Sequence, residues 1–578
     1  MKQWLKYVKK YWYYFVISAV CMAIDITGEV VMPKFLADII DEGVVNRDIR
    51  QIVVMTVFMM LTALMMLAGG VGSAYFGARA SSNFAADLRK DVYDKVQEFS
   101  FSNIDHFSTG SLVTRLTNDV TQIQNFVNML MRMGLRAPGM LIGGLVMATV
   151  LCPSLARILL LVMPLMVLGI VLIIRKAFPL FNDMQEKLDA LNSNIRENVT
   201  NIRVVKSFVR EEHEEKKFGK INENLKNAGL HAMKLMVGMQ PFMMLFMYIT
   251  TLMVLWFGGN TVMNGNLELG NLTAFLTYVT QILNSLIMVS VLFVVSTRAA
   301  ASGHRIQEVL KEEVSLKDTE ETDADLKVTE GKVEFRHVGF RYYSHSEDQV
   351  LSDISCTIEA GQTVGIIGST GCGKTTLVSM IPRLYDVDRG EVLIDGVNVK
   401  KYSLRHLREA VGMVLQNNTL FSGTVKDNLL WGDEDATDEM IHRAARWSQA
   451  DDFIRDFHGG YDYSLDHGGL NVSGGQKQRL CIARALLKKP KILILDDSTS
   501  AVDMATEAKI REMFREELQN TTKIIISQRI ASVMDADQII VMDDGRITGT
   551  GCHEELLRSN EEYREIYESQ MNQKEATV

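Results

Sequence analysis

Residues 363–378, TVGIIGSTGCGKTTLV, carry the strongest structural signal in this 578-residue chain. An apolar run typical of a strand leads into residues 368–376, which have the G-x-x-x-x-G-K-T spacing of a P-loop, and a helical pattern follows. Glycines let backbone N–H groups turn inward around phosphate groups at the N-terminus of a helix. The stretch therefore predicts an α/β domain with a nucleotide phosphate site.

The nine residues of the loop are the expected phosphate contacts, and the predicted ligands are ATP and Mg²⁺. Lys374 can reach the β- and γ-phosphates, and the Thr375 hydroxyl can bind Mg²⁺. Cys372 occupies a variable position of the motif, so we assign its thiol no chemistry. The loop set is Gly368, Ser369, Thr370, Gly371, Cys372, Gly373, Lys374, Thr375 and Thr376.

Two further motifs follow the P-loop. Residues 492–500, ILILDDSTS, form an apolar run that ends in the adjacent carboxylates Asp496 and Asp497. Residues 472–476, VSGGQ, precede another helical pattern and suggest a second phosphate contact. Carboxylates at the end of a buried strand commonly hold a metal ion or orient a water molecule, so the two aspartates need separate explanations.

The first 300 residues are far more apolar than the rest, although the whole chain looks ordinary at 47% hydrophobic, 23% charged and net charge −9. A helix that crosses a bilayer needs about 20 largely uncharged residues. Four stretches qualify, at residues 52–78, 137–156, 235–267 and 269–297. A fifth, at 158–174, is slightly shorter, and a sixth candidate starts at Tyr11 and is broken by Asp25 and Glu29. We therefore expect six membrane-spanning helices with two long connections, near residues 79–136 and 175–234.

Basic residues set the predicted orientation. Lys2, Lys6, Lys9 and Lys10 precede the first span, and Arg175, Lys176, Arg203, Lys206, Lys216 and Lys217 lie in the second long connection. The positive-inside rule therefore places the N-terminus and both long connections in the cytosol. Six spans return the chain to the cytosol, where the P-loop domain would meet ATP. The six cysteines show no paired or metal-ligand spacing, which fits a reducing compartment.

Two charged residues interrupt the first apolar span, and two more precede the third. Asp25 and Glu29 lie one helical turn apart and share a face. They could form a cavity-facing pair for cations or protons, or a solvated pair near the outer mouth, which is the interpretation we favour. We expect Arg132 and Arg136 at the cytosolic membrane boundary.

Six spans followed by the P-loop, VSGGQ and ILILDD motifs resemble the ATP-binding cassette (ABC) superfamily, as a half-transporter of the exporter type. The markers stand in family order over essentially the whole chain. The resemblance implies a transmembrane domain at 1–305, a linker at 306–331, an ATP-binding cassette at 332–570 and a tail at 571–578. It also implies coupling helices within 101–120 and 198–218, and two cassettes that enclose two ATP molecules.

The resemblance also assigns roles outside the P-loop. Tyr342 would stack on adenine, Gln416 would contact Mg²⁺ and sense the membrane domain, and Asp496 would be the Walker B aspartate. Residues 500–503 would form the loop that crosses to the partner cassette. The metal ligands would be Thr375, Gln416 and Asp496. The signature residues Ser473, Gly474, Gly475 and Gln476 would complete the partner's site.

Three positions depart from the family pattern. Asp497 stands where active members have a glutamate that activates water, and Gln528 stands where they have a histidine that contacts the γ-phosphate. Aspartate is one methylene shorter, so its oxygens fall back by about 1–1.5 Å. Glutamine can donate a hydrogen bond but cannot become cationic. His467 stands where many exporters have a glutamate.

The predicted function is therefore the ATP-binding, degenerate-site half of a bacterial heterodimeric exporter of the multidrug type. Hydrolysis is expected mainly at the partner's site, and the cargo would be a hydrophobic or amphipathic drug, lipid or peptide that leaves through the cell membrane. A homodimeric exporter or lipid flippase with reduced ATPase is the main alternative, and a regulatory or channel-type ABC protein is another. The six spans exclude a soluble ABC ATPase of DNA repair, and no basic patch suggests nucleic-acid binding.

Overall fold

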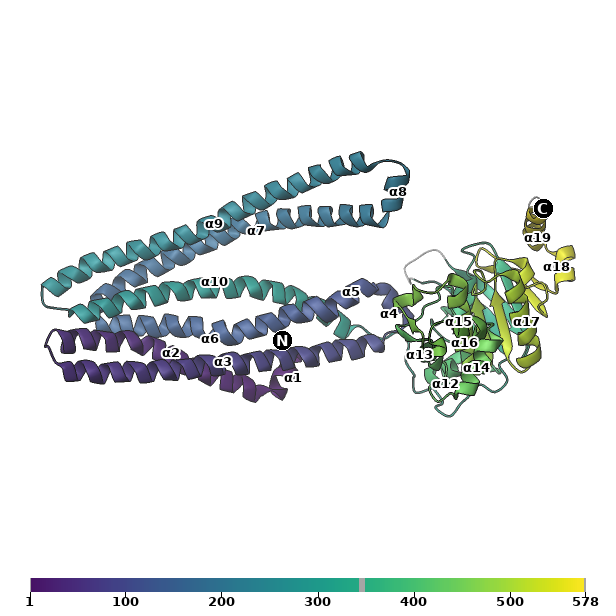
Figure 1. The fold of residues 1–578 in the computed structure, drawn as a ribbon, viewed down its shortest axis with the longest axis horizontal. Coiled ribbons are helices and arrows are strands. Elements are labelled where there is room, and N and C mark those ends of the chain that lie inside the picture. Colours follow the sequence, from purple (N-terminus) through teal and green to yellow (C-terminus); the bar gives the residue numbers. More distant parts are fainter. Residues whose placement is uncertain (1, 343–348, 576–578) are drawn as a thin grey trace. The chain divides into compact units, whose positions relative to one another are not determined.

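The computed structural model describes residues 2–342 and 349–575, and the chain divides into two compact units (Figure 1). The first comprises Met1–Gln97 and Thr109–Glu312, and the second comprises Glu98–Ser108 and Glu313–Val578. The predicted domain boundary at residue 305 lies inside a helix that continues to Lys311. The short segment Glu98–Ser108 groups with the nucleotide-binding part of the chain rather than with the apolar helices.

The first unit is entirely helical among its described residues. Six of its helices are long and apolar enough to cross a membrane, which confirms the predicted number of spans. Its elements are α1 (Lys2–Lys10), α2 (Trp12–Asp38), the π-helical turn η1 (Ile39–Val44), α3 (Ile49–Gln97), α5 (Thr109–Thr114), the π-helical turn η2 (Arg115–Asp119), α6 (Val120–Leu151), α7 (Pro153–Thr200), α8 (Ile202–Ser207), α9 (Glu211–Met263) and α10 (Leu269–Lys311).

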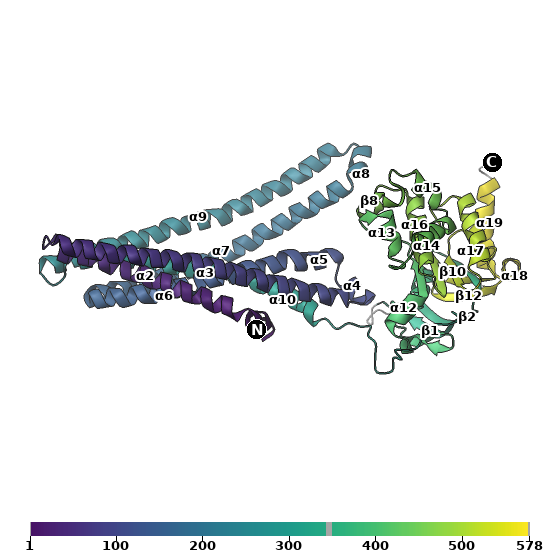
Figure 2. The same cartoon turned by 60° about the horizontal axis from the view of Figure 1, so that its bottom comes forward.

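The long helices pack as two groups. Helices α2, α3, α6 and α10 run side by side, whereas α7 and α9 form a hairpin that diverges from them and ends in the short helix α8 (Figures 1 and 2). Close contacts rely on glycine: a Cβ added at Gly28 of α2 would lie 2.4 Å from Met66 Cγ of α3. Asp41 caps the start of α10, since its carboxylate accepts hydrogen bonds from the N–H groups of Gly270 and Asn271.

Three charged residues meet inside the helical bundle. Arg136 of α6 donates from Nη1 to Asp25 Oδ2 over 2.8 Å and from Nη2 to Glu29 Oε2 over 2.6 Å. The Asp25 side chain is only 8% exposed. All three residues lie on helices that are long and apolar enough to cross a membrane.

One expectation about these residues is therefore wrong. Asp25 and Glu29 are not a solvated pair at the outer mouth, because they share the guanidinium of Arg136. An unpaired charge in an apolar bundle is costly, so the arginine and the two acids pair with one another across the α2–α6 contact.

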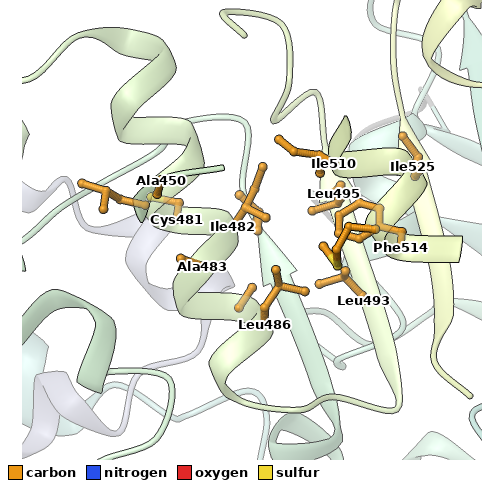
Figure 3. Close-up of a cluster of buried hydrophobic side chains, with 14 of the residues drawn as sticks. Ala450, Cys481, Ile482, Ala483, Leu486, Leu493, Leu495, Ile510, Phe514 and Ile525 are labelled. Carbon is orange, nitrogen blue, oxygen red and sulfur yellow. The ribbon is translucent and has the colours of Figure 1, made fainter. Parts of the chain in front are cut away.

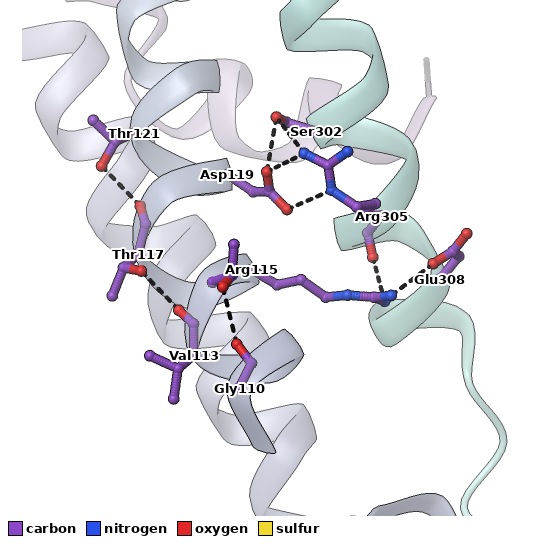
Figure 4. Close-up of polar contacts among 10 residues, drawn as sticks. Gly110, Val113, Arg115, Thr117, Asp119, Thr121, Ser302, Arg305 and Glu308 are labelled. Carbon is purple, nitrogen blue, oxygen red and sulfur yellow. Dashed lines mark hydrogen bonds and ion pairs between the residues drawn. The ribbon is translucent and has the colours of Figure 1, made fainter. Parts of the chain in front are cut away.

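A second ion-pair network joins η2 to the end of α10 (Figure 4). The buried Asp119 accepts hydrogen bonds from Ser302 Oγ over 2.9 Å and from Arg305 Nε over 2.8 Å. Arg115 donates to the Arg305 carbonyl over 2.9 Å and pairs with Glu308 at 3.0 Å. The network fixes the segment that follows α4 against the last turns of α10.

The second unit is an α/β domain with a predominantly parallel central sheet. Its strands are β1 (Val333–Phe340), β2 (Leu351–Ile358), β3 (Thr363–Gly368), β4 (Arg389–Ile394), β5 (Val397–Asn398), β6 (Val411–Val414), β7 (Gly423–Thr424), β8 (Ser464–Leu465), β9 (Ile492–Asp496), β10 (Thr522–Ile526), β11 (Gln538–Asp543) and β12 (Arg546–Gly551). The main sheet has the order β12-β11-β3-β10-β9-β6, and an antiparallel sheet has the order β2-β1-β4-β5.

Helices surround these sheets and include one from the N-terminal half of the chain. They are α4 (Phe101–His106), α11 (Lys374–Ser379), α12 (Leu404–Ala410), α13 (Val425–Leu430), α14 (Asp438–Trp447), α15 (Asp451–Asp456), α16 (Gly474–Leu487), α17 (Met504–Glu517), α18 (His553–Ser559) and α19 (Glu561–Glu575), with the 3₁₀ turns η3 (Val399–Lys401), η4 (Gly460–Asp462), η5 (His467–Gly469) and η6 (Ile530–Ser532).

The core of the second unit holds its functional strands in place. Ile482 and Leu486 of α16 pack in one buried cluster with Leu493 and Leu495 of β9 and with Phe514 of α17 (Figure 3). Every residue of β9 is buried. Burial on both faces explains why this strand reads as a continuous apolar run. The core thereby fixes the position at which the chain emerges with Asp496 and Asp497.

Candidate nucleotide-binding site

Four strands of the main sheet end at the same edge. Strands β3, β10, β9 and β6 are parallel neighbours, with Ile366 opposite Ile526, Ile526 opposite Asp496, and Val414 opposite Leu495. The segments that follow them carry the P-loop, Gln528, Asp497 and Gln416, respectively. Ligands of open α/β sheets bind at the carboxyl ends of the strands. The register therefore gathers residues that are far apart in the sequence around one site.

The P-loop turns tightly between β3 and α11. Gly371 and Gly373 have φ angles of 88° and 96°, which favour glycine. At Gly368 an added Cβ would lie 1.9 Å from the carbonyl oxygen of Met542, so only glycine fits. Lys374 folds over the loop and donates from Nζ to the carbonyls of Gly368 (2.9 Å) and Ser369 (2.6 Å). Its ammonium group is therefore held above the turn that would hold phosphates.

Asp496 and Thr375 lie together at this edge. The Thr375 hydroxyl donates to Asp496 Oδ1 over 3.0 Å. The second carboxylate oxygen of Asp496, Oδ2, is buried and has no hydrogen-bond partner among the described residues. Burial raises the pKa of Asp496, and the Thr375 hydrogen bond opposes that shift. An unpaired carboxylate oxygen beside a hydroxyl is suited to bind Mg²⁺, a divalent cation that prefers oxygen ligands.

Asp497 occupies a strained position next to Asp496. Its φ angle is 45°, in the left-handed region that aspartate tolerates better than most residues, and its N–H donates to the Ile526 carbonyl over 3.0 Å. Burial raises the pKa of Asp497, and the nearby Arg529 acts in the opposite direction. Gln528, two residues beyond Ile526, is exposed. The two departures from the family pattern thus follow adjacent strand ends.

Two other predicted contacts border the loop. Tyr342 is partly exposed, and its hydroxyl lies 2.9 Å from Thr376 Oγ1 in the P-loop. Gln416 is exposed and follows β6 beside β9. His467 is exposed in η5. The structure thus brings Tyr342 to the P-loop directly and places Gln416 at the neighbouring strand end.

The signature residues form the N-terminus of α16. Ser473 accepts a hydrogen bond from the Gln476 N–H over 3.3 Å, and Gln476 Oε1 accepts from the Ser473 N–H over 2.9 Å, a reciprocal capping box. An added Cβ at Gly475 would lie 2.8 Å from the Ala501 carbonyl oxygen. The free N–H groups of the first turn of α16 are suited to bind an anion.

Gln478 is a connecting residue that sequence reasoning missed. Its side chain donates to Ser500 Oγ over 3.2 Å and accepts from the Ala501 N–H over 3.0 Å. Arg529 donates to the Ser500 carbonyl over 2.8 Å from the other side. Residues 500–503 are thus tied both to the signature helix and to the segment of Gln528. The glutamine lies one turn after the signature glycines, but no local pattern distinguishes it from an ordinary polar helix residue.

Comparison with known proteins gives the family. Sequence models match the ABC transporter transmembrane region at residues 15–286 and the ABC transporter domain at residues 351–500. The uncharacterised ABC transporter ATP-binding protein YfiB of Bacillus subtilis is 39% identical over 570 residues, 99% of this chain and 98% of the relative. A fatty acid ABC transporter ATP-binding/permease protein of Mycobacterium bovis is 35% identical over 470 residues, 81% of this chain and 74% of the relative.

A solved structure has the same fold. A bacterial Atm1-family ABC exporter with ATP bound superimposes with a TM-score of 0.81, at 24% identity, over 96% of this chain and 98% of that one. This similarity confirms the predicted fold class, a six-helix membrane domain followed by an α/β cassette. The chain therefore belongs to the ABC transporter family, with the fold of an exporter and with an ATP-binding domain of the kind that couples ATP hydrolysis to transport.

Proposed function

We propose that this chain is the ATP-binding half of a heterodimeric exporter and hydrolyses ATP poorly at its own site. The observation that carries the proposal is the paired substitution at adjacent strand ends, Asp497 after β9 and Gln528 after β10. Both positions serve the hydrolytic step. The P-loop, the Asp496–Thr375 contact and the capped signature helix keep the features that binding needs.

The geometry of the P-loop indicates how this chain would bind ATP. A triphosphate would replace the loop carbonyls as the partner of Lys374, and the N–H groups at the start of α11 would donate to it. Thr375, Asp496 and Gln416 would hold Mg²⁺, which supplies charge neutralisation at the β- and γ-phosphates when bound. Tyr342, already beside Thr376, would stack on the adenine.

Hydrolysis at this chain's own site would be slow because the Asp497 side chain is too short and Gln528 carries no charge. An aspartate base whose oxygens fall about 1–1.5 Å short cannot hold the attacking water at hydrogen-bond distance. A displacement of about 1 Å in a catalytic group costs on the order of 100-fold in rate. Gln528 offers a neutral donor where a histidine can carry charge, so it adds no cationic stabilisation of the transferring phosphoryl group.

The partner subunit would supply the competent site. Ser473–Gln476 of this chain, at the N-terminus of α16, would complete that site, and residues 500–503 would cross to it. The bonds from Gln478 and Arg529 to Ser500 and Ala501 support this role, because they link the signature helix and the Gln528 segment to the crossing loop.

The proposed cargo is a hydrophobic or amphipathic molecule that is moved out of the cytosol through the cell membrane. An apolar hollow of about 400 Å³ between α2 and α3 supports this class; Val20, Ile24, Val31 and Met65 are among its lining residues. The Mycobacterium bovis relative is a fatty acid transporter by name, which fits the same class. The basic N-terminal segment supports a cytosolic N-terminus.

A single-turnover experiment tests the proposal. The full-length chain in lipid nanodiscs is mixed with a limiting amount of ATP labelled at the γ-phosphate and with Mg²⁺, and bound nucleotide is analysed over time. We expect tight binding with the label retained as ATP for many minutes, and no binding by a Lys374→Ala control. Conversion of the bound ATP to ADP within seconds would show that the site is competent and would overturn the proposal.

A further inference from the structure

Helix α4 contacts the cassette through one tyrosine. Tyr385, in the segment between α11 and β4, donates from its hydroxyl to Asp105 Oδ2 over 2.7 Å. The Phe101 ring lies 6.1 Å from the Tyr385 ring at an interplanar angle of 61°. Tyr385 therefore holds both ends of the six-residue helix, its first residue by a ring contact and its fifth by a hydrogen bond.

The same tyrosine contacts the aromatic residue of the nucleotide site. The Tyr385 ring lies 5.3 Å from the Tyr342 ring in an edge-to-face arrangement of 89°, and 5.5 Å from the Phe340 ring. Tyr342 in turn reaches the P-loop, since its hydroxyl lies 2.9 Å from Thr376 Oγ1. Three contacts thus connect the P-loop with α4: Thr376 to Tyr342, Tyr342 to Tyr385, and Tyr385 to Asp105.

Other bonds of α4 lead to the chain that enters the cassette rather than to the nucleotide site. Ser100 Oγ lies 2.6 Å from Ser315 Oγ, and Asn103 Nδ2 donates to the Glu313 carbonyl over 3.0 Å. These bonds anchor the helix but do not involve a nucleotide-site residue. Tyr385, by contrast, contacts both α4 and Tyr342 of the nucleotide site.

We propose that Tyr385 is a positioning residue that reports occupancy of the base side of the nucleotide site to α4. The inference rests on the proposed function, since it requires Tyr342 to contact the adenine. A base stacked on Tyr342 restricts the ring of Tyr342, and the edge-to-face contact restricts Tyr385 in turn. The charge-assisted hydrogen bond to Asp105 then passes that restriction to α4.

The adenine base and the phosphates of ATP should differ in their effect on α4. A ligand that fills the P-loop but carries no base leaves Tyr342 without its stacking partner, so it does not order α4 through Tyr385. Inorganic triphosphate is such a ligand, and ATP supplies both parts. Coupling between two sites of a protein corresponds to affinity changes of about 5- to 150-fold, so an effect of this size is measurable.

Hydrogen exchange of the α4 backbone in the full-length chain in nanodiscs tests the proposal. With Mg²⁺ present, saturating ATP should slow exchange at Phe101–His106 by about tenfold, and saturating triphosphate by less than about twofold. Tyr385→Phe keeps the ring and removes the hydroxyl, so ATP should bind with unchanged affinity but slow α4 exchange by less than about twofold. Asp105→Ala should behave in the same way, whereas Asp105→Asn keeps an acceptor oxygen and should retain the ATP response.

Tyr461→Phe is the matched control. The Tyr461 hydroxyl also donates to an aspartate, Asp451 Oδ1 at 2.6 Å, in the same unit but without a contact to α4 or Tyr342. This variant should retain the full ATP response at α4. Nucleotide binding is measured separately with a fluorescent ATP analogue, so loss of binding would refute the proposed function instead. Normal ATP protection of α4 in Tyr385→Phe, equal protection by triphosphate, or no ATP effect in the wild type would each overturn the role of Tyr385.

Discussion

Removing Arg136 should destabilise the membrane domain far more than neutralising either of its acidic partners. Arg136 makes charge-assisted hydrogen bonds of 2.8 and 2.6 Å to Asp25 and Glu29. In Arg136→Gln two carboxylates one helical turn apart lose their shared counter-charge, and Asp25 is only 8% exposed. Breaking a buried ion pair by removing one partner costs about 3–5 kcal/mol, and the partial exposure of Arg136 and Glu29 favours the lower value, about 3 kcal/mol.

Neutralising Glu29 leaves one positive and one negative charge, Arg136 and Asp25, paired with each other. Glu29→Gln retains Arg136 with Asp25, so its cost should stay near 1 kcal/mol, about the value of a lost hydrogen bond. The triple variant Asp25→Asn, Glu29→Gln, Arg136→Gln has no charge left to compensate and should recover most of the stability lost in Arg136→Gln. The free energy of unfolding is measured by denaturant titration in mixed micelles. The reasoning fails if Glu29→Gln costs as much as Arg136→Gln, or if the triple variant is no more stable than the single one.

Three further predictions concern other contacts. Gly368→Ala should abolish ATP binding because its Cβ meets a carbonyl oxygen at 1.9 Å. Gly371→Ala meets no atom within 4 Å and carries only the backbone strain of a φ of 88°, so it should weaken binding by less than about tenfold; a fluorescent nucleotide measures both. Gln478→Leu should leave ATP binding by this chain intact but lower hydrolysis at the partner's site by about tenfold in the co-purified complex, because the crossing loop loses two bonds. Asp119→Ala should lower the unfolding free energy by about 2 kcal/mol through the lost pair with Arg305, as thermal unfolding would show.

Local signals allowed much of this fold to be predicted. The P-loop is a contiguous pattern whose glycines are required by the turn itself, as at Gly368 against Met542. The six spans are visible because an apolar environment requires long uncharged stretches, and the described part of the chain has six such helices. Strand β9 is recognisable since burial on both faces demands a continuous apolar run.

Contacts between distant segments could not be predicted in the same way. The pairing of Arg136 with Asp25 depends on which faces of α2 and α6 meet, and helix periodicity alone does not give that. Tyr385 and Asp105 lie 280 positions apart, and although Asp105 falls within the expected coupling segment at 101–120, nothing in the sequence pairs it with Tyr385. Gln478 looks like any polar residue on α16 until the loop at Ser500 is placed beside it. The sequence alone did not show that α10 continues to Lys311, because its last turns are polar and resemble a linker in composition.

The central claim is that Asp497 and Gln528 limit hydrolysis at this chain's own site. The most direct measurement is steady-state ATPase activity of the purified chain alone in nanodiscs with Mg²⁺. The wild-type rate is compared with the rates of Asp497→Glu, of Gln528→His and of the double variant, each measured at an ATP concentration that gives the same occupancy of the site. We predict negligible turnover by the wild type and at least a tenfold gain in the double variant, since each restored side chain serves the same step. Robust hydrolysis by the wild type, unchanged in the double variant, would contradict the account.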